Sequence, residues 1–209
     1  MDVATTPLAG ATLRQASVSE QDNNAYLLTC AATGAQLLVD AADSARDVLE
    51  LVAAGGGSLD TVVTTHRHWD HHRALAEVVS ATGAATAAGE DDADAMPVVP
   101  DRRLAHGDGV PVGDLRLDVV HLRGHTPGSV ALAWRDGDGT VHLFTGDSLF
   151  PGGPGRTTNP RDFASLMDDL TARVFDVYPD SSRVYPGHGA ATTLGAERSS
   201  LPEWRARGW

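Results

Sequence analysis

A dense run of histidines directly follows an apolar segment of this chain. The stretch TVVTTHRHWDHHRAL places His66, His68, Asp70 and His71 within six positions. Residues two apart in an extended segment point to the same side, so His66 and His68 share one direction. We expect Asp70 and His71 to begin a helix and turn toward the same cavity. Imidazole and carboxylate together suit Zn²⁺, Fe²⁺ or Mn²⁺, so the run predicts a metal site rather than a polar loop that only forms hydrogen bonds.

Single candidate ligands follow three later predicted strands. His125 in RGHTPGS, Asp147 in FTGDSLF and His188 in YPGHGA each lie beside a glycine or close to one. Glycine lets the backbone turn sharply and bring a short side chain into a confined site. Together with the first run, these residues give five histidines and two aspartates, which is enough for two metal ions.

The hydrophobic pattern predicts strands followed by a helix in each half of the chain. Residues 23–31 and 35–41 form an expected hairpin. Ser44 is expected to cap an amphipathic helix that ends at Gly55. Further predicted elements are strands at 59–65, 115–122, 129–135, 140–147 and 182–189, and helices from about 71 to 80 and from 162 to 177, the last capped by Asn159 or Asp162. We expect no regular element at 90–101. Periodicity alone leaves two packed sheets and one open doubly wound sheet as alternatives.

The motifs resemble those of the metallo-β-lactamase superfamily, from about Asn24 to Arg198. The run from His66 to His71 matches the family pattern H-x-H-x-D-H. The resemblance implies an α/β fold, a four-layer αββα sandwich, in a single domain over 1–209. Within the superfamily, THRHWDH, GHTPGS, FTGDSLF, GGPGRT and PGHG are similar to the single-domain glyoxalase II-like hydrolases.

The resemblance also implies how the ligands divide between two ions. The expected set is His66, His68 and His125 for one ion, Asp70, His71 and His188 for the other, and Asp147 as a bridge between them. A carboxylate has an oxygen for each ion, and a water or hydroxide completes the bridge. We expect two Zn²⁺ ions, with Fe or Mn as alternatives.

Such a site suits hydrolysis. Zinc lowers the pKa of bound water from 15.7 to about 7, so hydroxide is present at neutral pH and can attack a thioester or ester carbonyl. The expected catalytic residues are Asp147, as the bridging ligand, and Asp70, which steers the hydroxide or relays a proton. The expected substrate is therefore a small thioester or ester.

Two further residues are candidates for contact with substrate. Arg156 could bind a substrate carboxylate with two hydrogen bonds, or be a solvated loop residue. Tyr185 could hydrogen-bond substrate, although a tyrosine at a strand end is more often part of the core. Trp69 is expected to serve packing, and His72 to be an exposed helix residue rather than a support for the ligands.

Several other functions fit the same motifs. A persulfide dioxygenase would hold a single iron through His66, His125 and Asp147, and it shares the GRT sequence. A lactonase differs in substrate alone. The net charge of −12, with no lysine, argues against a nuclease and against docking to an anionic membrane. Full-length glyoxalase II carries a C-terminal domain that holds glutathione, whereas 21 residues follow His188 here, so the thiol carrier stays open.

The remaining expectations concern the cell and the oligomer. Cys30 is the only cysteine, so no intrachain disulfide forms. The N-terminus has no signal-peptide pattern and no segment has the length of a membrane span. These features predict a cytoplasmic protein with a small-molecule partner and no nucleic acid or membrane partner. The oligomeric state is unknown.

Overall fold

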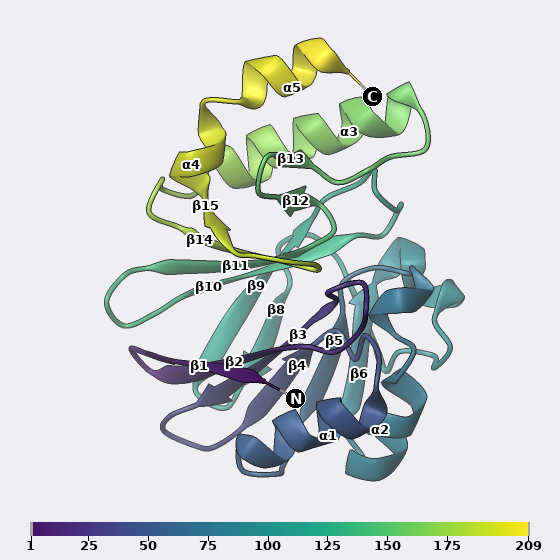
Figure 1. Cartoon of the computed structure of the whole chain (residues 1–209), viewed down its shortest axis with the longest axis vertical. Helices are drawn as coiled ribbons and strands as arrows, with labels where there is room; N and C mark the ends of the chain where they lie inside the picture. The colour runs from purple at the N-terminus through teal and green to yellow at the C-terminus, as the bar shows by residue number, and fades with distance from the viewer. Residues whose placement is uncertain (1, 209) are drawn as a thin grey trace.

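Two mixed β-sheets face each other in the computed structural model, which describes residues 2–208 (Figure 1). The first sheet has seven strands in the order β1 (Val3–Leu8), β2 (Ala11–Ser17), β3 (Asn24–Cys30), β4 (Gln36–Val39), β5 (Thr61–Thr64), β6 (Ala85–Gly89) and β7 (Arg102–Leu104). The second has six strands in the order β15 (Thr192–Thr193), β14 (Arg183–Pro186), β11 (Val141–Gly146), β10 (Val130–Arg135), β9 (Leu115–His121) and β8 (Gly109–Val112). A separate pair joins β12 (Leu149–Phe150) to β13 (Gly153–Pro154).

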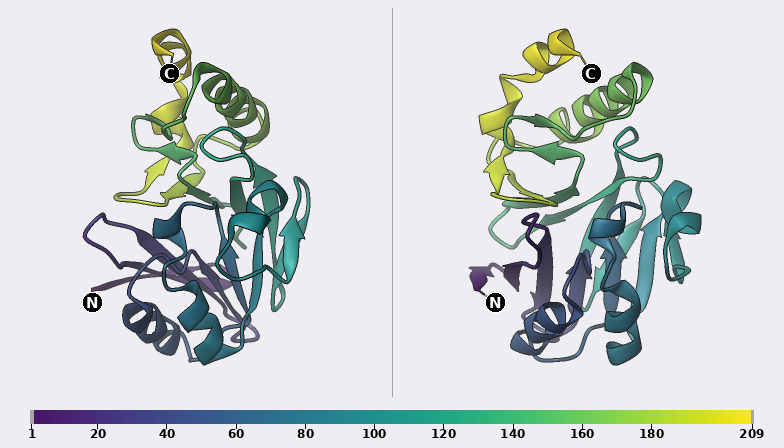
Figure 2. Two further views of the ribbon diagram at one scale, coloured as in Figure 1. Left: turned by 90° about the vertical axis from the view of Figure 1, so that its right-hand side faces the viewer. Right: turned by 45° about the vertical axis from the view of Figure 1, so that its right-hand side comes forward.

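Helices cover the outer face of each sheet. The first sheet is covered by α1 (Ala45–Ala54) and α2 (Leu75–Thr82). The second is covered by α3 (Pro160–Leu170), the π-helical turn η3 (Thr171–Phe175), α4 (Leu194–Arg198) and α5 (Leu201–Arg207). Two short 3₁₀ helices, η1 (Trp69–His71) and η2 (Glu90–Ala95), lie between strands. Figure 2 shows the blue helices on one side and the green and yellow helices on the other, so the four-layer αββα sandwich is confirmed.

Three apolar layers fill the spaces between these four layers. Tyr26, Leu28 and Phe144 lie between the sheets. Leu27, the neighbour of Tyr26 on β3, faces the opposite way and packs under α1 and α2. Successive side chains of a strand alternate between its two faces, so a strand that is covered on both sides reads as one apolar run. This explains why NAYLLTC and VHLFTG gave clear sequence signals.

Most of the predicted elements are present, but one predicted cap makes no capping hydrogen bond and one helix begins later than predicted. The hairpin is β3 and β4, and Asn159 caps α3 by accepting a hydrogen bond from the backbone N–H of Asp162. Ser44 holds the cap position of α1, but its hydroxyl donates to the carboxylate of Asp47 instead of accepting from the helix backbone. The helix predicted from residue 71 begins at Leu75, because η1 occupies the residues before it.

Several elements carried too weak a signal to be predicted. Strand β6 reads ATAAG, and alanine and glycine have low β propensity. Strands β1 and β2, and the 3₁₀ helix η2 in the region predicted to be irregular, were also missed. In the C-terminal tail, Trp204 is 2 % exposed and packs into the layer under α3, whereas Trp209 lies outside the described residues. Between residues 2 and 208, no helix is both long and apolar enough to cross a bilayer.

Candidate metal centre

The candidate ligands lie at the carboxyl ends of four strands. The loop after β5 carries His66, His68, Asp70 and His71, and the loops after β9, β11 and β14 carry the other three. Strands β11 and β14 are parallel neighbours, so the segments that leave them start at the same edge of the second sheet. The same edge faces the end of β5, since Val130 at the start of β10 donates from its N–H to the carbonyl of Thr65.

These loops bring all seven predicted ligands together in three overlapping groups. In each group the possible ligand atoms lie within 4.8 Å of one another. The groups are His66, His68 and His125; His66, His71 and Asp147; and Asp70, His71 and His188. The first and third groups match the two predicted ligand sets, and Asp147 lies between them, 3.6 Å from His125 and 3.5 Å from His188.

Four of the histidines have one ring nitrogen fixed by a neighbour. Nδ1 of His125 donates to the carbonyl of Arg156 (2.6 Å), and Nδ1 of His188 donates to the carbonyl of Gln21 (2.8 Å). Nδ1 of His71 donates to Asp40 (2.9 Å). Because Thr65 donates its hydroxyl to Asp40, that hydroxyl accepts from Nδ1 of His66. In each case Nε2 is the nitrogen that faces the cluster, which is the arrangement that a metal-binding histidine needs.

Other atoms in the centre lack the partners that buried polar groups normally have. Nε2 of His125 and Oδ1 of Asp147 are buried and have no hydrogen-bond partner among the described residues. Nε2 of His66 faces Nδ1 of His68 at 3.1 Å, and Nε2 of His71 faces Nε2 of His188 at the same distance. Unpaired buried polar atoms are costly, and converging nitrogen lone pairs repel each other unless they share a cation or a proton. The donor set therefore fits divalent metal ions.

The first group is suited to bind a cation as neutral imidazole. Burial lowers the pKa of His66, His68 and His125, and the neighbouring histidines lower each of them further. A ligand that is neutral at pH 7 does not have to lose a proton before it binds a metal ion.

The second group holds more charge. Burial opposes a charge on His71, but the carboxylates of Asp147 (3.4 Å) and Asp40 (2.9 Å) outweigh it and raise its pKa to about 10. The carboxylate of Asp147, 3.5 Å away, also raises the pKa of His188. Burial opposes ionisation of Asp147, but the nearby His188 and His71 outweigh it and lower its pKa well below the ordinary value. Asp147 therefore stays ionised, and its negative charge favours a cation at the second position.

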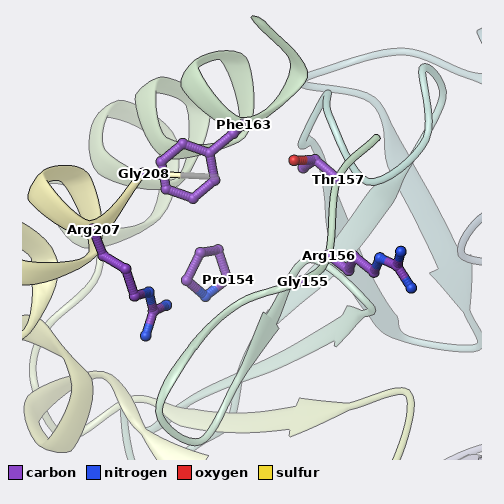
Figure 3. Close-up of a pocket in the computed structure, with 7 residues that line it drawn as sticks. All are labelled: Pro154, Gly155, Arg156, Thr157, Phe163, Arg207 and Gly208. Carbon is purple, nitrogen blue, oxygen red and sulfur yellow. The ribbon is translucent and has the colours of Figure 1, made fainter. Parts of the chain in front are cut away.

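His68 and His125 of the first group line two cavities. One, of about 440 Å³, is lined by these histidines with Arg156 and the two threonines that follow it. The other, of about 370 Å³, is lined by Arg67, Arg123 and Arg161 among others. Figure 3 shows a third cavity behind the Gly/Pro segment, between Phe163, Pro154 and Arg207, and the side chain of Arg156 points away from it. Arg156 is exposed on the side of the metal ligands.

Three residues near the motifs lie differently from their predicted places. Tyr185 is 7 % exposed, packs between the sheets and has its hydroxyl 3.1 Å from Nδ1 of His142, so we do not carry it forward as a substrate contact. Trp69 is 59 % exposed, with Arg73 over its ring, so it does not pack into the core. His72 is only partly exposed, and its Nε2 lies 3.1 Å from the carbonyl of Arg67, within the ligand loop.

Three buried polar residues at the centre escaped the sequence analysis. Asn23, Asp40 and Asp92 are each no more than 2 % exposed, and each contacts a ligand or a residue next to one. Asp40 directly follows an apolar run, and Asp147 follows another at a short distance. This similar position in the sequence could have identified Asp40 as a candidate site residue. Asn23 and Asp92 lie among other polar residues, and their sequence context does not distinguish them.

Comparison of the chain with known protein families agrees with this geometry. The model of the metallo-beta-lactamase superfamily matches residues 19–188, which include all seven ligands. The chain belongs to this superfamily. Membership of the metallo-beta-lactamase superfamily explains both the two-sheet fold and the position of the ligand loops.

Relatives within the superfamily are similar over most of this chain. A hydroxyacylglutathione hydrolase from Fuscovulum blasticum is 40 % identical over 170 residues, which cover 80 % of this chain and 63 % of the relative. The chain thus spans about three-fifths of the length of that relative. The crystal structure of ETHE1 from Myxococcus xanthus superimposes with a TM-score of 0.79 at 31 % identity, over 91 % of this chain and 83 % of the other. TTHA1623, crystallised in a di-iron-bound form, superimposes with a TM-score of 0.74 at 30 % identity. The match covers 91 % of this chain and 99 % of the other.

Proposed function

We propose that this protein is a dinuclear metal-dependent hydrolase of the glyoxalase II-like type that cleaves a small thioester. The observation that carries the proposal is the position of Asp147 between a three-histidine group and the group of Asp70, His71 and His188. The identity with hydroxyacylglutathione hydrolases supports the same reaction class, and the di-iron form of TTHA1623 supports two metal positions. Zinc as the metal, a single domain over 1–209 and a cytoplasmic location stay predictions.

The ligand residues would divide the work. Bound divalent ions would activate water and polarise the substrate carbonyl as Lewis acids. Oδ2 of Asp147 lies 3.6 Å from Nε2 of His125 and 3.5 Å from Nε2 of His188, so this carboxylate would hold the two positions at a fixed separation. Asp70 is partly exposed, and Asn23 holds one of its oxygens at 3.1 Å, so its other oxygen is free to accept a proton or orient water.

Arginines around the first group would select the substrate. Arg156 lines one flanking cavity, and Arg67, Arg123 and Arg161 line the other. Arg156 and Arg161 take part in none of the ion pairs found among residues 2–208. A guanidinium without a partner is suited to bind a carboxylate. We therefore propose that the preferred thioester carries a carboxylate in its acyl group or its thiol carrier.

A panel of small S-acyl thioesters tests the function through release of free thiol. We expect hydrolysis by the metal-loaded protein, loss of hydrolysis after chelation, and recovery on adding Zn²⁺. Asp147→Asn is expected to lower the rate at least about 100-fold, because it removes the charge shared by both groups. A loaded protein that releases thiol from no thioester, yet consumes oxygen with a persulfide, would replace this proposal with the dioxygenase.

A further inference from the structure

Two fully buried polar side chains outside the ligand set lie against the centre from opposite sides. Asn23 and Asp92 are both 0 % exposed. Asn23 comes from the loop between β2 and β3, and Asp92 comes from η2 after β6. Each has every one of its polar side-chain atoms directed to a partner, and the two sets of partners lie in or beside different ligand groups.

Asn23 contacts the group of Asp70, His71 and His188. Its amide nitrogen donates to the carbonyl of Asp70 (3.0 Å) and to Oδ2 of Asp70 (3.1 Å), and it lies 3.3 Å from Nε2 of His188. Its amide oxygen accepts from the hydroxyl of Ser19. The backbones of Asn23 and His188 also form an isolated β-bridge. One side chain therefore sets the orientation of the Asp70 carboxylate and the distance between Asp70 and His188.

Asp92 contacts the loops that hold His68 and His125. Its Oδ2 accepts from the N–H of Arg67 (3.0 Å) and from the hydroxyl of Thr126. Its Oδ1 accepts from the N–H of Gly128 (3.0 Å). Arg67 is next to both His66 and His68, and Thr126 follows His125, so one carboxylate joins the two loops of the three-histidine group. The fit leaves no spare room, because a Cβ on Gly128 would lie 2.8 Å from the Asp92 carboxyl carbon.

We propose that Asn23 and Asp92 are positioning residues, each of which supports metal binding at one position only. Asn23 supports the position of Asp70, His71 and His188, and Asp92 supports the position of His66, His68 and His125. The inference rests on the two metal positions of the proposed function. Residues behind metal ligands commonly change metal affinity 10- to 100-fold, so an effect of this size is expected at the supported position.

The test measures Zn²⁺ binding to the full chain after its metal has been removed with a chelator. The two variants are Asn23→Ala, which removes the amide, and Asp92→Asn, which replaces an acceptor oxygen with a donor. His188→Ala and His68→Ala each weaken one position and so report on the other. Isothermal titration of the single and double variants forms two double-mutant cycles, which separate a local effect from a general one.

The expected result is a crossed pattern. In the His188→Ala background the remaining ion is at the three-histidine position, so Asp92→Asn lowers its affinity about 10- to 100-fold and Asn23→Ala changes it less than about threefold. In the His68→Ala background the remaining ion is at the other position, so Asn23→Ala lowers its affinity about 10- to 100-fold and Asp92→Asn changes it less than about threefold. Equal losses in both backgrounds, or no loss from either variant, would overturn the proposal.

Controls separate positioning from folding. Asp101→Asn is a matched control for Asp92→Asn, because Asp101 accepts from the N–H (2.8 Å) and hydroxyl (2.9 Å) of Thr86, away from the ligand loops, and its loss should leave both affinities unchanged. If Asp92→Asn or Asn23→Ala does not fold, Thr126→Val and Ser19→Ala remove one hydroxyl from each contact. These milder variants should lower affinity at the same positions by at least about threefold, and no change would count against the inference.

The experiment measures Zn²⁺ binding alone, so its result does not depend on whether the protein cleaves a thioester. A wild-type chain that binds two Zn²⁺ ions but cleaves no thioester contradicts the proposed reaction and leaves the crossed pattern testable. A wild-type chain that binds two ions and shows no crossed pattern contradicts only the roles of Asn23 and Asp92.

Discussion

Oδ2 of Asp40 lies 2.9 Å from Nδ1 of His71, across 31 residues of sequence, and fixes which nitrogen of this imidazole faces the centre. Oδ1 of the same carboxylate accepts from the N–H of Thr65 (2.7 Å), the residue before the first histidine of the run. The Asp40 oxygen accepts this hydrogen bond, so Nδ1 of His71 carries a proton and Nε2 is the nitrogen that faces the other ligands. Asp40 therefore connects the end of β4 to two parts of the ligand loop.

Asp40→Asn is expected to weaken metal binding at the position of His71 about 10- to 100-fold, because an amide cannot accept from all three donors. Free Zn²⁺ affinity, measured with a competing chelator, checks the prediction. Asp60→Asn is a suitable control, since Asp60 accepts from the N–H of Gln36 at the far end of the same strands. An unchanged affinity in Asp40→Asn would show that the contact does not orient the ligand.

Arg156→Ala is expected to raise KM for thioesters that carry a carboxylate and to change kcat little. The guanidinium lines the cavity beside His68 and His125 and is not among the metal ligands, so its loss should remove binding energy common to ground and transition states. A charge-assisted contact contributes about 1.5–3 kcal/mol, which corresponds to roughly a 10- to 100-fold change in KM. Steady-state kinetics on charged and uncharged thioesters checks this. Arg46→Ala on α1 is the control, and an equal effect on uncharged thioesters would contradict a carboxylate contact.

Asp169→Asn is expected to destabilise the fold in a pH-dependent way. Burial opposes ionisation of Asp169, but hydrogen bonds from the side chain (2.8 and 2.7 Å) and backbone (3.0 Å) of Arg123 outweigh it and lower its pKa. A lowered pKa contributes stability above the unfolded-state value of about 3.9, and this contribution is lost as pH falls through the folded-state value. The difference in unfolding free energy between wild type and variant should stay constant from about pH 8 to 5 and narrow below about pH 4. Urea unfolding at several pH values checks it, and a difference that grows on acidification would be inconsistent with this pairing.

Trp204→Ala is expected to reduce the free energy of unfolding by about 3–5 kcal/mol. The side chain of Trp204 extends from α5 into the core, where it is 2 % exposed and packs against Phe175. Trp69→Ala, at a side chain 59 % exposed, should cost about 1 kcal/mol or less. Denaturant unfolding of the metal-free proteins compares them. Similar losses in the two variants would mean that the C-terminal helix does not close this layer.

The seven ligands were predictable because they are concentrated or repeat a recognisable pattern. His66, His68, Asp70 and His71 fall in one short run, and the other three each follow a strand and lie beside a glycine. The strands buried on both faces were predictable for the same reason, since β3 and β11 read as continuous apolar runs. Strand β6 was not, because its alanines pack well only against neighbours that the sequence does not name.

The residues that orient the ligands were not predictable, because their roles come from tertiary contacts. Asp92 and Thr126 are 34 residues apart, and Asn23 and His188 are 165 apart. In the sequence, Asp92 within EDDADA cannot be distinguished from a solvated acidic residue. In the structure, η2 directs its side chain into the interior. Tyr185 shows the opposite case: its place beside the PGHG motif suggested substrate contact, but β14 directs its ring between the sheets.

Elemental analysis of the purified full chain, with the bound metal counted per protein molecule, distinguishes a two-ion centre from its alternatives. We expect two divalent ions per chain, falling to one in His188→Ala and in His68→Ala, with thioester hydrolysis that follows the metal content. A single iron per chain, unchanged after reconstitution with excess Zn²⁺, or no retained metal at all, would contradict a two-ion hydrolytic centre.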